Sequence, residues 1–167
     1  MRCSKCGGAV IEGKCFDCGE EMKESLLEMK DLDKYSASCD IEMLLKLEKF
    51  WSQKLFKHHE SLAVLRDRIA KLKIDQGSFR EALKMLDLGL EYTEARYGDN
   101  SIEMGHELLK YSDVLVILLQ TGATVNSDKV RLEQTLIKSL KIFELQNGSG
   151  SKVCKEIKDK LATLCCI

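Results

Sequence analysis

The sequence lacks an excess of charge, a long apolar run and a signal-peptide pattern. Its 26 lysines and arginines balance 27 aspartates and glutamates, so charge gives no argument for binding nucleic acid, a membrane surface or another polyanion. No run of about 18 apolar residues occurs, so no segment is expected to span a membrane. Because no secretory signal precedes Cys3, we expect a reducing compartment, the cytosol or the nucleus, rather than a disulfide scaffold.

Catalytic signatures are missing as well. There is no phosphate-binding glycine loop, no dinucleotide fingerprint and no Ser-His-Asp order. His58 and His59 stand near a helix end, where a solvated pair is expected rather than metal ligands. His106 lies within a helical pattern and is expected to be packed or hydrogen-bonded. We therefore assign no catalytic or cofactor-binding residue, and whether the chain belongs to an enzyme stays open.

Cysteine is abundant, with eight residues in 167, and four of them form two Cys-x-x-Cys pairs. The pairs are Cys3 with Cys6 and Cys15 with Cys18. Each pair predicts a tight knuckle that aims two sulfurs at one point, and two such knuckles complete a tetrahedral site for structural zinc. Glycines follow both pairs, where knuckles need positive φ angles. Residues 10–11 and 14–16 are expected to form the short strands of a zinc ribbon over residues 1–20.

Other functions of these cysteines are less favoured. A redox dithiol would be expected near a βαβ pattern, which is absent here. Catalytic zinc needs an open coordination position, and four thiolates leave none. Binding of DNA or RNA by the ribbon needs surface lysine and arginine, but residues 1–20 hold three basic and three acidic side chains.

Beyond residue 20 the pattern is helical and glycines separate the segments. Ser78 and Glu81 fit a capping box, and Asp40 and Ser101 fit N-caps. Short connections predict antiparallel neighbours. The expected helices cover about 23–32, 41–55, 62–76, 79–97, 102–121, 128–147 and 152–164.

Two features indicate helical repeats. The hinge over 77–82 matches that of a tetratricopeptide hairpin, in which a glycine ends the first helix and an alanine, here Ala82, starts the buried face of the second. Segment 90–98 is echoed by 140–148, with leucine, glutamate and a closing glycine at the same places. We therefore predict a mainly α protein of tetratricopeptide-like antiparallel hairpins over 21–167; an ordinary helical bundle is the alternative.

The segment from Ser101 to Lys110 reads Ser-Ile-Glu-Met-Gly-His-Glu-Leu-Leu-Lys. It resembles a segment in the C-terminal helical domain of the SET and MYND domain-containing family of protein-lysine methyltransferases. The Arg-Tyr-Gly over 96–98, the hinge over 77–82 and the leading cysteine ribbon resemble the same family in the same order. Together they cover nearly the whole chain.

The resemblance implies a part of such an enzyme. In that family a split SET domain binds S-adenosylmethionine, a MYND zinc finger interrupts it, and a cysteine-rich post-SET segment leads into a tetratricopeptide-like domain that binds partners, including chaperones. This sequence has no Asn-His-Ser-Cys cofactor motif and no MYND ligand series. We expect a non-catalytic scaffold module that binds a protein or peptide, such as a chaperone or chromatin-associated protein. The alternative is a fragment of an active methyltransferase, with S-adenosylmethionine bound only by the full-length parent; a nucleic-acid adaptor is the least favoured hypothesis.

Overall fold

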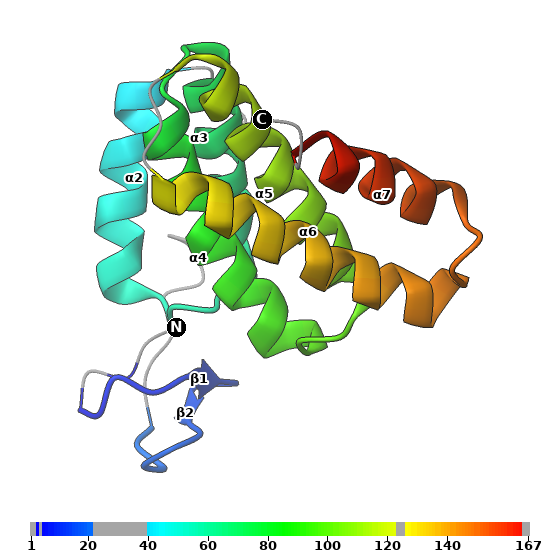
Figure 1. Ribbon diagram of the computed structural model, residues 1–167. Helices are drawn as coiled ribbons and strands as arrows, with labels where there is room; N and C mark the ends of the chain where they lie inside the picture. Colours follow the sequence, from blue (N-terminus) through cyan, green and yellow to red (C-terminus); the bar gives the residue numbers. More distant parts are fainter. Residues whose placement is uncertain (1–2, 4, 22–39, 123–125, 165–167) are drawn as a thin grey trace.

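The computed structural model describes Cys3 and residues 5–21, 40–122 and 126–164 (Figure 1). A small two-stranded ribbon comes first, and every later element of the described part is a helix. The prediction of a mainly α protein with a cysteine cluster near its N-terminus is confirmed. The short helix expected over 23–32 lies outside the described residues, and the domain boundary at residue 20 stays a prediction.

The helices agree closely with the predicted segments. Their bounds are α2 (Ile41–Lys54), α3 (Glu60–Asp75), α4 (Phe79–Tyr97), α5 (Ile102–Gln120), α6 (Asn126–Asn147) and α7 (Lys152–Leu164). Helix α6 begins two residues before the expected start at residue 128. Gly77 follows α3 with φ 71°, and Gly98 and Gly148 follow α4 and α6 with φ 91° and 81°. These left-handed conformations explain why glycine ends each segment.

Two of the three predicted N-caps are confirmed. Asp40 accepts hydrogen bonds from the backbone N–H groups of Glu42 and Met43, and the Ser101 hydroxyl accepts one from Met104. Each cap satisfies donors that the first helical turn leaves without a partner.

The prediction of a capping box at Ser78 is wrong. Its hydroxyl makes no cap hydrogen bond. The Ser78 N–H, which Glu81 was expected to reach, already donates to the carbonyl of Lys73 at 2.8 Å as part of the turn at Gly77. Glu81 instead pairs with the ammonium of Lys73 at 2.5 Å. The tight connection between α3 and α4 therefore uses the donor that a capping box would need.

The helices stack in chain order, and each packs against the next (Figure 1). One apolar cluster joins α2 to α3 through Trp51, Leu62 and Ile69, and a larger one runs from α3 to α7. Met85 packs against both clusters, so the core is continuous along the stack. Ala70 and Ala82 are fully buried beside the Gly77 hinge, as a close helical hairpin requires.

Ion pairs also join helices two apart in the chain. Asp67 of α3 pairs with Lys110 of α5, and Asp87 of α4 pairs with Arg131 of α6. Asp113 of α5 continues the pattern by pairing with Lys160 of α7. These ion pairs connect α3 to α5, α4 to α6 and α5 to α7 through long side chains, whereas the extensive packing contacts are between successive helices. This order fits a tetratricopeptide-like array, in which repeats bury their faces by stacking. In the described part, no helix is both long and apolar enough to cross a membrane.

Candidate functional site

The ribbon forms from a short antiparallel hairpin. Strand β1 (Val10–Ile11) pairs with β2 (Lys14–Cys15), and Val10 lies opposite Cys15. Both expected strands are confirmed, although the second ends at Cys15. Gly13 completes the turn with φ 77°. The hairpin places the second cysteine pair against the first.

The two Cys-x-x-Cys knuckles have the same backbone pattern. The N–H of Gly7 donates to the carbonyl of Cys3 at 2.9 Å, and the N–H of Gly19 donates to the carbonyl of Cys15 at 3.0 Å. Both glycines have positive φ angles, 78° and 72°. An added Cβ at Gly8 would lie 1.9 Å from a carboxylate oxygen of Asp17, so this exposed side chain would have to move. The positive φ angles of Gly7 and Gly19 therefore explain the glycine that follows each cysteine pair.

The four sulfurs converge on one point. The Sγ atoms of Cys3, Cys6, Cys15 and Cys18 all lie within 4.8 Å of one another. Cys3 Sγ is 3.7 Å from Cys18 Sγ, and Cys6 Sγ is 3.4 Å from Cys15 Sγ. Four soft donors at one point could hold a metal ion.

Backbone N–H groups support the sulfurs. Lys5 N–H donates to Cys3 Sγ and Gly8 N–H donates to Cys6 Sγ, each at 3.4 Å. Such bonds orient thiolate ligands and reduce their negative charge.

The thiols influence one another's ionisation. The backbone N–H of Cys6 is the largest cause that lowers the pKa of the Cys3 thiol to about 7, against the opposing effect of burial. The Gly8 N–H acts in the same direction on Cys6, but the sulfurs of Cys15 and Cys18 outweigh it and raise the pKa of Cys6 to about 12. The first thiolate therefore opposes ionisation of its neighbours. A bound divalent cation would remove this repulsion and allow all four to ionise.

The three histidines are not among the residues of the sulfur cluster, and each makes a different local contact. Nδ1 of His59 accepts a hydrogen bond from Ser61 N–H and caps α3. His58 packs against the ring of Phe56, and both His58 and His59 are half-buried, which differs from the expected solvated pair. The His106 ring contacts the ring of Phe143 edge-on, with 5.0 Å between centroids, but His106 is exposed, so it is only partly packed.

A second candidate site is a groove of about 430 Å³ between α3, α4 and α5. Its volume lies in the range of about 300–1,000 Å³ that ligand sites occupy. Its α4 wall is mostly apolar and contains a glycine, with Met85, Leu86, Gly89 and Thr93 among the lining residues. Val64 and Tyr97 line it while about half exposed, at 55% and 49%.

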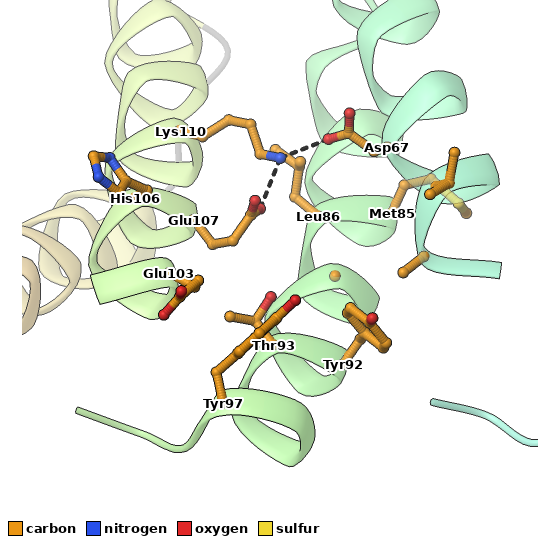
Figure 2. A pocket seen from close by; sticks show the side chains of 13 residues that line it. Asp67, Met85, Leu86, Tyr92, Thr93, Tyr97, Glu103, His106, Glu107 and Lys110 are labelled. Atoms are coloured by element: carbon orange, nitrogen blue, oxygen red, sulfur yellow. Dashed lines mark hydrogen bonds and ion pairs between the residues drawn. The ribbon is translucent and has the colours of Figure 1, made fainter. Parts of the chain in front are cut away.

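Charged side chains from α3 and α5 complete the groove. Figure 2 shows Lys110 between Asp67 and Glu107, with Nζ–O distances of 2.5 and 2.7 Å. Burial by itself would lower the pKa of Lys110, but its hydrogen bonds to these two carboxylates outweigh burial and raise the pKa. Glu103 also lines the groove and is exposed. Three carboxylates against one ammonium leave the groove acidic.

Sequence reasoning identified the cysteine cluster but none of the groove residues. The cysteine spacing is local, so the sequence carries the whole signal. The groove combines residues of three helices, and one sign of it was available: Gly89 stands inside a helical pattern where no turn is expected.

Comparison with known proteins gives one distant relationship. No protein-family model matches this chain. Over 105 residues it is 29% identical to protein-lysine N-methyltransferase SMYD4 from Gallus gallus. The matched region covers 63% of this chain and 14% of that relative's length. The chain is therefore distantly similar to a small part of a SET and MYND domain-containing protein, in agreement with the resemblance of its Ser101–Lys110 segment.

Proposed function

We propose that this chain is a protein-binding module of a SET and MYND-related protein, with a zinc ribbon at its N-terminal end. The groove on the helical array carries the proposal, because it offers apolar surface and charged side chains on a rigid scaffold of helices. The family resemblance suggests chaperones or chromatin-associated proteins as partners, in the cytosol or the nucleus.

The sulfur geometry supports zinc as the metal. Zn–S bonds of about 2.3 Å in a tetrahedron require S–S separations of about 3.8 Å. The separations of 3.7 Å for Cys3–Cys18 and 3.4 Å for Cys6–Cys15 are close to this value, and all four sulfurs lie within 4.8 Å of one another. Four thiolates close the coordination sphere, which favours a structural role over a catalytic one.

Two measurements test the proposal. Elemental analysis of protein purified under reducing conditions should give one zinc per chain, and Cys15→Ser should lower that ratio. Screening the zinc-loaded chain against a library of short capped peptides of all charge types should find binders in the micromolar range or tighter. Protein without zinc, or the absence of any peptide binder, would contradict the corresponding part of the proposal.

A second function is favoured by the relative's name. The chain would then be part of an S-adenosylmethionine-dependent protein-lysine methyltransferase whose catalytic residues lie elsewhere in a longer product. The purified chain should transfer no label from S-adenosylmethionine to protein substrates, whereas a longer product of the gene should do so. Transfer by the chain alone would contradict the assignment of no catalytic residue to it.

A further inference from the structure

Gly89 occupies a position that the packing of the chain does not explain. It lies in the interior of α4, where glycine is less favourable than alanine because it loses more backbone entropy on folding. An added Cβ at Gly89 would meet no atom within 4 Å. Gly105, the other glycine inside a described helix, is different, because a Cβ there would press on Ile142 and Phe143. Gly105 allows two helices to approach, whereas Gly89 only leaves space open in the groove.

The side chains around Gly89 define what could fill this space. Met85 and Thr93 stand one turn before and after it on α4, and Val64 lines the groove from α3. The lining is mainly apolar at this point, so an apolar side chain would lose contact with water by entering.

The charges of the groove select the rest of the ligand. Lys110 is held by Asp67 and Glu107, so its ammonium is already neutralised and is poorly placed to receive a carboxylate. Glu103 makes no ion pair within the described residues, although it lines the same groove. A cationic side chain would find an unpaired carboxylate here, and an anionic one would be repelled.

We propose that the groove between α3, α4 and α5 binds a peptide segment that carries an apolar side chain beside a lysine or arginine. In this proposal the apolar side chain lies over Gly89, and the cation pairs with Glu103. Figure 2 shows Glu103 on the α5 side of the groove and Tyr92, Thr93 and Tyr97 on the α4 side. This inference rests on the proposed protein-binding function and names the partner's chemistry and the residues that select it.

The test uses three short capped peptides with the same apolar centre of leucine and valine, flanked by arginine, glutamine or glutamate. Binding to the zinc-loaded full chain is measured by fluorescence anisotropy at low and high salt. The arginine peptide should bind most tightly, and added salt should weaken it, because salt screens exposed charges. Equal binding of all three, or preference for glutamate, would overturn the inference and leave the broader protein-binding function standing.

Gly89→Leu fills the space over α4 and should weaken binding of the arginine peptide about tenfold or more. Leucine is also a better helix former than glycine, so the variant should stay folded. Lys84→Leu is the matched control, since Lys84 is exposed on α4 and does not line the groove. Undiminished binding by Gly89→Leu would place the peptide elsewhere and overturn the inference.

Glu103→Gln should weaken the arginine peptide about twofold to fivefold and leave the glutamine peptide unchanged. Glu94→Gln removes an exposed charge of α4 outside the groove, so it should change the affinity for neither the arginine peptide nor the glutamine peptide. Sedimentation of the chain without peptide completes the test. Self-association that Gly89→Leu abolishes would identify a second copy as the occupant, against the inference. If none of the three peptides binds while the screened library yields other binders, only the inference fails.

Discussion

Replacing Gly105 by alanine measures how closely α5 and α6 approach each other. A Cβ at Gly105 would lie 3.1 Å from Cγ2 of Ile142 and 3.2 Å from the ring of Phe143. Both side chains are buried, so they have little room to move away. Overpacking of this kind costs about 1–3 kcal/mol, and alanine regains about 1 kcal/mol of helix propensity. We therefore expect Gly105→Ala to lower the free energy of unfolding by about 1 kcal/mol.

Gly89→Ala is the matched control. It makes the same chemical change inside a neighbouring helix, but nothing lies within 4 Å of the added Cβ. Because no overpacking opposes it, only the gain in helix propensity from glycine to alanine remains, and this variant should raise the free energy of unfolding by about 1 kcal/mol. The two variants should thus differ by about 2 kcal/mol with opposite signs.

Urea unfolding followed by far-UV circular dichroism gives both values, and thermal midpoints should move by about 2–4 °C per kcal/mol for a chain of this size. A double-mutant cycle adds a check. Ile142→Leu removes the γ-methyl group that the new Cβ would meet, so it should cost less in the Gly105→Ala background than in the parent protein. Equal stabilisation by both alanine variants would refute the close approach of α5 and α6.

Three further outcomes are expected. Chelation of the metal should unfold the ribbon while the helical circular dichroism signal persists. The affinity for the metal should fall as the pH is lowered, because protons compete with the metal for the thiolates. An affinity independent of pH would argue against thiolate ligands. Ser101→Ala should lower the free energy of unfolding in urea by about 1 kcal/mol. Ser78→Ala should lower it by less than about half of that, because the Ser78 hydroxyl forms no cap hydrogen bond whereas that of Ser101 does. Arg66 Nε lies 3.0 Å from the largely buried carboxylate of Glu48, so Arg66→Met leaves that carboxylate without its cation and should lower the free energy of unfolding by about 3 kcal/mol. Lys152→Met removes the cation of an exposed ion pair and should leave the free energy of unfolding nearly unchanged in the same assay.

The sequence by itself determined the cysteine site and most helix ends. Both depend on residues close together in the chain: the knuckles need Cys-x-x-Cys with glycines beside it, and the helices end where Gly98 and Gly148 adopt positive φ. The error at Ser78 shows the limit of local reasoning. The pattern for a capping box was present, but the preceding helix had already taken the Ser78 N–H through its carbonyl at Lys73.

Only the tertiary structure decided the groove and the roles of the two helical glycines. Gly89 and Gly105 are both glycines inside helical patterns, and nothing in the sequence separates them. The fold brings Ile142 and Phe143 against Gly105 and leaves open space over Gly89. The physical reason is that packing depends on which helices become neighbours, and this is set by contacts across the whole array rather than by local propensity.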